Sequence, residues 1–298
     1  MRITVRVPAT SANLGPGFDC FGLALDLCNE VTVDTEAEPG VTWQGEGADE
    51  LPTDGSDMVS GAISFTVEQQ LQLHPNAELP SFSLHGINRI PLERGLGSSS
   101  AAAVAGVALA NALLGEAASD TSPEDLYPIF GYAASIEGHS DNAAAAVYGG
   151  FTIVATGSVH RLDPHPDLDP VVLVPERLRL PTTAAREALT KEVSRRDAVF
   201  NVSHASLAVF ALTKEPDLLE TALHDRLHED ARLELIPEAR DLLHELRQGR
   251  RVASCVSGAG PSLLAFEREG STVGELPEGW RAIRPGVQAN GVEVFVED

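Results

Sequence analysis

The chain has 298 residues, with 44 Asp or Glu against 21 Lys or Arg, so its formal net charge is −23. Such a charge repels phosphate backbones and anionic membrane surfaces, so we expect neither a nucleic-acid partner nor membrane association. A content of 43% hydrophobic and 22% charged residues is typical of a globular protein and excludes a disordered or fibrous one. Three cysteines without a C-x-x-C pair favour a reduced, cytoplasmic protein.

In the first half of the chain, apolar spacing predicts strands and helices without a regular alternation. We expect strands at 2–7, 31–35, 41–43, 81–85 and 151–156. We expect helices at 58–73, 101–114 and 124–136, the last capped by Ser122. Residues 157–170 combine Pro and Gly with acidic residues and histidines, which is typical of a boundary between domains.

The second half continues the mixed pattern. We expect strands at 171–174, 252–257, 261–266 and 291–296, and helices at 183–190, 197–213, 216–225 and 237–248. Because strands and helices do not alternate as βαβ units, the sequence predicts an α+β fold rather than a doubly wound sheet. The predicted domains are 1–156 and 166–298.

A glycine- and serine-rich segment, Gly95–Ala101, opens the Ala-rich helix. Glycines allow a tight turn, and the free N–H groups at a helix start favour an anion such as phosphate. The segment is neither a Walker A loop nor a Rossmann fingerprint. Taken alone, it is compatible both with a phosphate loop and with a plain structural cap.

Three further segments concentrate polar or flexible residues. Pro8–Asp19 follows the first strand as a loop of small residues, and Ser257–Ser262 lies between two apolar strands; each could be a simple turn. Glu137–Asn142 places five polar side chains between apolar stretches, where they must be paired or functional. Glu137 or Asp141 is a candidate ligand for Mg²⁺, which prefers oxygen.

Together and in this order, the four segments resemble the motifs of the GHMP kinase superfamily, and within it those of the homoserine kinase family. The matching runs are Pro8–Gly22, Pro91–Ala103, Glu137–Asn142 with Gly149–Phe151, and Ser254–Ser262. The resemblance covers almost the whole chain. It implies an α+β, two-domain GHMP kinase fold, with a ribosomal-protein-S5-like N-terminal domain that carries the phosphate loop and a ferredoxin-like C-terminal domain.

The resemblance also implies ligands and roles. ATP would have its phosphates surrounded by Pro91, Leu92, Glu93, Arg94, Gly95, Leu96, Gly97, Ser98, Ser99, Ser100 and Ala101. Ser99 and Glu137 would hold Mg²⁺. In L-homoserine, the ammonium group would meet Asn13 and Asp19, and the carboxylate would meet Arg186 and Arg232, accompanied by Thr182.

The resemblance places His139, Asp141 and Asn142 near the substrate hydroxyl. Some GHMP relatives have an aspartate base close to this point, whereas here an amide, Asn142, matches the homoserine kinases. An amide cannot accept a proton at neutral pH, so we expect Asn142 to orient the hydroxyl. The implied product is O-phospho-L-homoserine, a step toward threonine, and the implied assembly is a cytoplasmic homodimer.

Two alternatives remain open. One is a GHMP kinase for another small alcohol, such as mevalonate or shikimate, which are carboxylates without an ammonium group. The other is a non-catalytic nucleotide or amino-acid sensor on the same fold. The sequence departs from the family pattern at Asp57, where an Asn often contacts adenine, and at His204, where an Arg often follows Asn-x-Ser.

Overall fold

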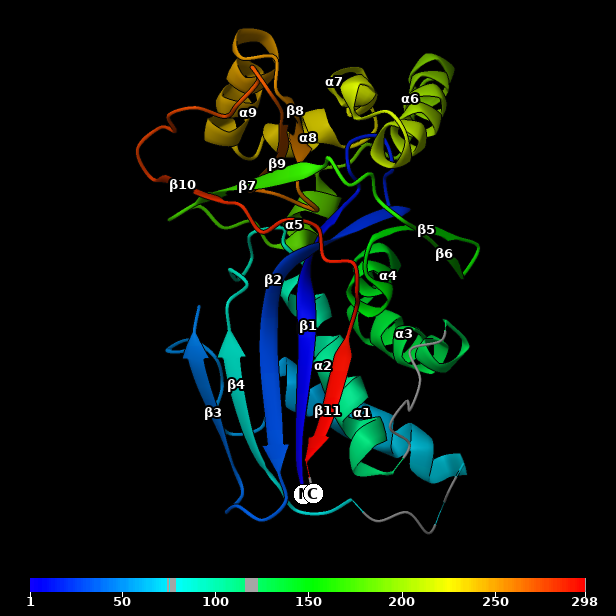
Figure 1. Ribbon diagram of the computed structural model, residues 1–298, viewed down its shortest axis with the longest axis vertical. Coiled ribbons are helices and arrows are strands. Elements are labelled where there is room, and N and C mark those ends of the chain that lie inside the picture. Colours follow the sequence, from blue (N-terminus) through cyan, green and yellow to red (C-terminus); the bar gives the residue numbers. More distant parts are fainter. Residues whose placement is uncertain (74, 76–78, 116–122, 298) are drawn as a thin grey trace.

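The computed structural model describes residues 1–73, 75, 79–115 and 123–297. Figure 1 shows its two sheets and the helices that pack against them. The helix cap expected at Ser122 lies outside these residues. Among the described helices, none is long and apolar enough to cross a membrane.

The larger layer is a seven-stranded sheet built around one long hairpin. β1 (Arg2–Ala12) and β2 (Phe21–Asp34) pair antiparallel at its centre. The order is β11-β1-β2-β4-β3, with the β5–β6 hairpin attached to β2. The remaining bounds are β3 (Gly40–Gly45), β4 (Ser83–Asn88), β5 (Phe151–Ala155), β6 (Ser158–Leu162) and β11 (Glu293–Glu297). Ile3, Val5 and Val7 alternate along β1 and are fully buried, as the sequence pattern predicts.

Helices cover one face of this sheet (Figure 1). They are α1 (Met58–Leu73), α2 (Ser98–Leu113), α3 (Pro123–Glu137) and α4 (Ser140–Tyr148). Helix α2 is buried along nearly its whole length, because its small residues allow close packing. A Cβ atom on Gly106 would lie 2.5 Å from the carbonyl oxygen of Val59 in α1. The short helix α4 was missed by the sequence analysis.

The smaller layer is a four-stranded antiparallel sheet with order β10-β7-β9-β8. Its strands are β7 (Asp169–Pro175), β8 (Ala253–Val256), β9 (Leu263–Glu267) and β10 (Trp280–Ile283). Alternate residues of β7 enter different cores: Val172 and Val174 join the core of the large sheet, and Val171 and Leu173 join a second core with α9. The small sheet is therefore buried on both faces.

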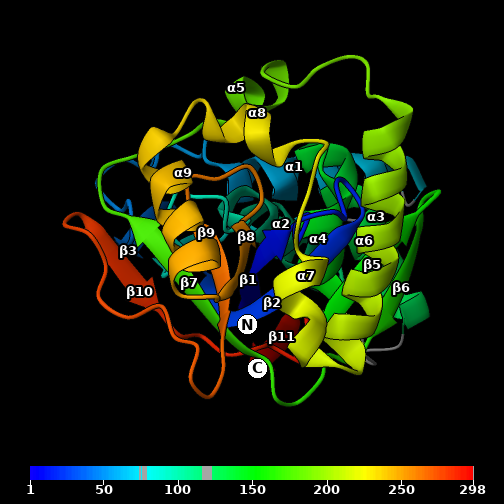
Figure 2. The same ribbon diagram turned by 90° about the horizontal axis from the view of Figure 1, so that it is seen from above.

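The helices of the second half of the chain lie around the small sheet and are seen from above in Figure 2. They are α5 (Thr182–Glu187), α6 (Arg195–Thr213), the 3₁₀ turn η1 (Pro216–Leu218), α7 (Leu219–Ala222), α8 (Glu229–Leu233), α9 (Pro237–His244) and the π turn η2 (Glu245–Gly249). The helix expected at 216–225 is thus two short turns, and the one expected at 237–248 ends in a π turn.

The strand pairing has the α+β character expected from the sequence. Among the described strands, β3 and β4 form the one parallel pair. The segment expected to form the domain boundary, 157–170, contains strand β6, which belongs to the large sheet. The C-terminal strand β11 also returns to pair with β1. The division into domains at 1–156 and 166–298 stays a prediction.

Candidate active site

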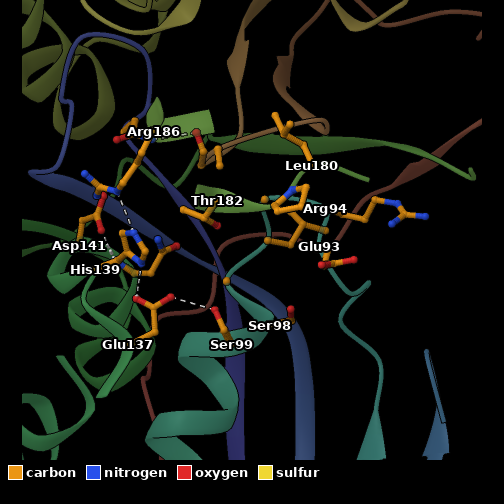
Figure 3. Close-up of a pocket in the computed structure, with 18 of the residues that line it drawn as sticks. Glu93, Arg94, Ser98, Ser99, Glu137, His139, Asp141, Leu180, Thr182 and Arg186 are labelled. Carbon is orange, nitrogen blue, oxygen red and sulfur yellow. Dashed lines mark hydrogen bonds and ion pairs between the residues drawn. The ribbon is translucent and has the colours of Figure 1, made fainter. Parts of the chain in front are cut away.

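A cavity of about 320 Å³ brings the four sequence motifs together, although they are far apart in the chain. Figure 3 shows its lining. The predicted site residues that line it are Asn13, Asp19, Glu93, Arg94, Gly95, Leu96, Gly97, Ser98, Ser99, Glu137, His139, Asp141, Asn142, Thr182, Arg186 and Arg232. The strand β1 reaches Ala12, so the first motif contributes a shorter loop than expected.

The glycine-rich loop ends at the N-terminus of α2. Gly97 precedes the helix in a left-handed conformation (φ 67°) and makes no side-chain cap. The first N–H groups of α2 therefore remain available to an anion, and the helix dipole adds favourable potential. A Cβ on Gly97 would lie 2.0 Å from Thr10 Oγ1, and one on Gly95 would lie 2.2 Å from the carbonyl oxygen of Ser257. Only glycine fits this close approach.

Part of the predicted loop does not reach the cavity. Pro91, Leu92, Ser100 and Ala101 are absent from its lining, and the Ser100 side chain is fully buried in the fold. In this structure the Ser100 hydroxyl is enclosed within the fold and is not part of the cavity wall. The Arg94 guanidinium donates to the carbonyls of Leu92, Pro175 and Glu176, and Figure 3 shows that it points away from the other lining side chains. It joins the loop to the end of β7.

A chain of hydrogen bonds crosses the cavity from the loop to α5 (Figure 3). Ser99 Oγ donates to Glu137 Oε1 at 2.8 Å, and Glu137 Oε2 lies 2.9 Å from His139 Nδ1. Arg186 Nε donates to His139 Nε2 at 2.9 Å. The hydrogen bond with Glu137 raises the pKa of His139, against the opposing effect of burial. The two predicted metal ligands, Ser99 and Glu137, are thus in direct contact.

Opposite charges meet on the other side of the cavity. Arg186 forms two hydrogen bonds with the Asp19 carboxylate, at 2.9 and 3.2 Å. Asn13 Oδ1 accepts from the Asp19 backbone N–H, and Asn13 Nδ2 donates to the Gly258 carbonyl. Arg232 donates to the same carbonyl and is only 2% exposed. Burial lowers the pKa of Arg232 to about 10. This value is still well above neutral pH, so the guanidinium stays charged there.

Asp141 and Asn142 lie in the first turn of α4. Asp141 is 4% exposed, and burial raises the pKa of its carboxyl to about 6, although it accepts a hydrogen bond from the Asn142 backbone N–H. Asn142 Oδ1 accepts from Thr10 Oγ1 at 2.8 Å. This bond fixes the side-chain amide beside Gly97 of the phosphate loop.

A second, largely apolar pocket adjoins the first and shares Ser98 with it. Its walls include Trp43, Met58 and Ile87. Asp57 also lines it, but both carboxylate oxygens of Asp57 accept hydrogen bonds from Ser60 at the start of α1. The other departure, His204, stacks on the Phe200 ring in α6.

Four residues in or behind the cavity wall were not predicted as site residues. Leu180, Pro181 and Thr183 line the cavity beside Thr182, and their position before a short helix was their only signal. His228 contacts both Arg232 and the first motif, and it lies four residues before Arg232 in the sequence. Within the described residues, no cluster of three or more His, Cys, Asp or Glu forms a protein-only metal site.

A family model described as GHMP kinases N terminal domain matches residues 58–150, which include the phosphate loop and the Glu137–Asn142 segment. The fold and the site thus define a phosphotransferase of the GHMP kinase class. Over its whole length the chain is 42% identical to a homoserine kinase from Clavibacter michiganensis subsp. michiganensis, covering 95% of that protein. It is 46% identical to one from Cutibacterium acnes, with coverage of 89% of this chain and 88% of the relative. The chain belongs to the homoserine kinase family.

Solved structures agree. A homoserine kinase from Cytophaga hutchinsonii superposes with a TM-score of 0.81 at 26% identity, over 99% of this chain and 97% of the other. A mevalonate kinase, at 12% identity and a TM-score of 0.68 over 96% and 99% of the two chains, shares the fold. The expected α+β GHMP kinase fold is confirmed.

Proposed function

We propose that this protein transfers the γ-phosphoryl group of ATP to the side-chain hydroxyl of L-homoserine, giving ADP and O-phospho-L-homoserine on the way to threonine. The observation that carries the proposal is the position of Asp19, Arg186 and Arg232 on one cavity with the N-terminus of α2. A carboxylate and two guanidiniums complement an amino acid zwitterion, and an uncapped helix start complements phosphate.

The α2 amides and the hydroxyls of Ser98 and Ser99 would hold the phosphates, because the loop contains no lysine. Ser99 and Glu137 bring hydroxyl and carboxylate oxygens within 2.8 Å of each other, and Mg²⁺ prefers such oxygen ligands together with phosphate oxygens. A site completed by phosphate needs no three-residue protein cluster. The ion would neutralise charge that develops on the β- and γ-phosphates.

In the reaction, the homoserine hydroxyl oxygen forms a bond to the γ-phosphorus while the bond from that phosphorus to the ADP oxygen breaks. Asn142 can orient the hydroxyl because its own oxygen is fixed by Thr10. The carboxyl of Asp141, with its pKa raised to about 6, is largely ionised at neutral pH and can accept the proton that leaves the hydroxyl. His139 would hold the side chains of Glu137 and Arg186 in their relative positions through its two ring nitrogens.

The apolar pocket that shares Ser98 with the main cavity would take the adenine ring. A flat apolar ring suits walls such as Trp43 and Ile87, and ATP is long enough to occupy both pockets. Because both oxygens of Asp57 serve α1, we assign no polar contact with adenine to that side chain. We further propose that the enzyme is a cytoplasmic homodimer, to be checked by light scattering of the purified protein.

The test is a coupled assay of ADP release with Mg²⁺-ATP and L-homoserine, D-homoserine, L-serine, mevalonate and shikimate. Selective turnover of L-homoserine supports the proposal. Turnover of mevalonate or shikimate alone would retain the kinase chemistry and overturn the amino acid pocket. Binding of ATP without turnover of any alcohol would favour a sensor.

A further inference from the structure

His228 lies behind the cavity, immediately before α8. Its side chain is 1% exposed, and its ring stacks on that of Phe18 with centroids 5.1 Å apart and planes at 26°. The backbone N–H groups of Leu227, His228 and Glu229 all donate to Asp225, at 2.8–3.0 Å. Both the backbone and the ring plane of His228 are therefore fixed.

Both ring nitrogens of His228 have partners, and those partners determine its protonation state. Nε2 lies 2.8 Å from the Gly15 carbonyl oxygen, which can only accept, so Nε2 carries a hydrogen. Nδ1 lies 2.9 Å from Nη1 of Arg232, which can only donate, so Nδ1 must accept. These contacts require the neutral ring, and burial favours it by lowering the pKa of His228.

The histidine thereby connects two parts of the amino acid pocket. Gly15 belongs to the loop that carries Asn13 and Asp19, and Arg232 lines the cavity from α8. Arg232 Nη1 donates both to His228 and to the Gly258 carbonyl, which also accepts from Asn13. A shift of His228 would displace the guanidinium relative to the loop.

The partners of Arg232 are neutral, and this is the chemically important feature. Within the described part of the chain, its hydrogen bonds go to an imidazole nitrogen and a carbonyl oxygen, and its buried Nε has no partner. Arg186, in contrast, is already paired with Asp19. A guanidinium held by neutral acceptors keeps its charge for an incoming carboxylate, whereas an acidic partner would neutralise it.

We infer that His228 is a positioning residue for the substrate carboxylate: as a neutral acceptor, it orients Arg232 without neutralising it and ties it to the Asn13–Asp19 loop. The inference rests on the proposed function, in which Arg232 binds that carboxylate. The histidine does not touch the substrate itself.

Three substitutions separate the functions of the ring. In His228→Asn the amide oxygen takes the place of Nδ1, so the acceptor for Arg232 is kept and the donor to Gly15 is lost. In His228→Gln the amide nitrogen takes the place of Nε2, so the donor is kept and the acceptor is lost. His228→Asp has the shape of the Asn variant but adds a negative charge beside Arg232. A matched surface control is His160→Gln, at an exposed histidine on β6.

We expect the Gln and Asp variants to raise the homoserine KM about tenfold or more, since a hydrogen bond to a charged group and its orientation are lost or the charge is neutralised. The Asn variant should stay within about threefold of the wild type. The ATP KM should change by less than about twofold in all three variants. The midpoint of thermal unfolding should fall more in the Asn and Asp variants than in the Gln variant, because the first two leave the Gly15 carbonyl unpaired.

Equal homoserine KM values for the Asn and Gln variants, or parallel rises for ATP and homoserine, would assign His228 to packing alone and overturn the inference. Equal values for the Asn and Asp variants would overturn the requirement for neutrality. Turnover by the wild type, measured in the same assay, reports on the proposed function separately: its absence would refute that function and this inference with it, whereas its presence leaves only the variants to decide.

Discussion

The guanidinium of Arg186 and the carboxylate of Asp19 pair with each other across the pocket, with Nη2–Oδ1 2.9 Å and Nη1–Oδ2 3.2 Å. Both side chains are more than a third exposed, at 38% and 42%, so solvent screens their attraction and a pair of this kind contributes roughly 0–1 kcal/mol. A zwitterionic substrate can separate them at small cost and give each a new partner. A ligand with one charge would leave the other protein group unpaired.

Asp19→Asn should therefore weaken the binding of amino acids specifically. We expect the homoserine KM to rise about tenfold or more, because the charge that faces the ammonium group is lost. Turnover of 4-hydroxybutyrate, which lacks that group, should be slow in the wild type and change less than about threefold in the variant. Steady-state kinetics with both alcohols measure this. A similar loss for both alcohols would contradict a role in recognising the ammonium group.

Glu137→Gln tests the magnesium assignment. Glu137 keeps its size in this variant but loses the charge that would hold the ion, so we expect kcat to fall at least about 100-fold. The matched control is Glu124→Gln, on the exposed first turn of the same helix α3, which should behave as the wild type. Turnover is measured over a series of Mg²⁺ concentrations. An unchanged kcat and Mg²⁺ dependence would remove Glu137 from the metal site.

Trp43 offers a signal for the nucleotide. It lines the apolar pocket, whereas the other tryptophan, Trp280, lies in β10. In a Trp280→Phe variant we expect ATP to change the emission of Trp43, because the adenine ring would replace water at the indole. Homoserine alone should leave the emission unchanged. An emission that does not respond to saturating ATP would place the base elsewhere.

The sequence identified most of the residues that line the cavity, but it missed some elements of the fold. The glycines of the phosphate loop and the charged residues of the pocket belong to local motifs, so their residue types and spacing can be recognised in the sequence. In contrast, β11 pairs with β1 because of an encounter between the two ends of the chain, which no local pattern encodes. Helix α4 was missed because the polar residues of its first turn follow closely on the helix predicted at 124–136, while its buried face consists mainly of alanines.

The contribution of each loop residue was likewise hidden in the sequence. Ser98, Ser99 and Ser100 look equivalent there, but successive residues of a helix point in different directions, and Ser100 faces the core. His228 was overlooked because its importance depends on Gly15, which is 213 positions away. Such long-range hydrogen bonds become visible only when the fold is known.

Asp141→Asn should make the protein more stable at neutral pH and less active. Burial raises the pKa of Asp141 to about 6, from an ordinary value of 3.8, so the folded state binds its proton more tightly than the unfolded state does. Stability from this group is full below pH 3.8 and is lost as the pH rises through 6. Ionisation then costs on the order of 3 kcal/mol, which the amide avoids.

Chemical denaturation at several pH values measures this. The gain in free energy of unfolding of the variant over the wild type should grow between pH 4 and pH 7 and then level off, whereas a gain independent of pH would show that Asp141 does not titrate in this range. The difference between the two proteins cancels the titration of other carboxylates. If Asp141 accepts the proton of the substrate hydroxyl, kcat should fall in the same variant mainly above pH 6, where the wild-type carboxyl is ionised.

Gly97→Ala tests the close approach of the phosphate loop. The added Cβ would lie 2.0 Å from Thr10 Oγ1, which holds Asn142, and it would also occupy a left-handed backbone. Gly115→Ala is the matched control, because Gly115 has a similar φ of +79° but no described residue that an added Cβ would meet within 4 Å. The control should lose only the stability that the strained left-handed backbone costs an alanine, about 1–2 kcal/mol, and it should keep full activity. Gly97→Ala should lose more stability and at least about tenfold in kcat/KM, since a small misplacement at the reacting groups is costly. Equal effects of the two substitutions on stability and kcat/KM would show that backbone strain, rather than contact with Thr10, is what the glycine relieves.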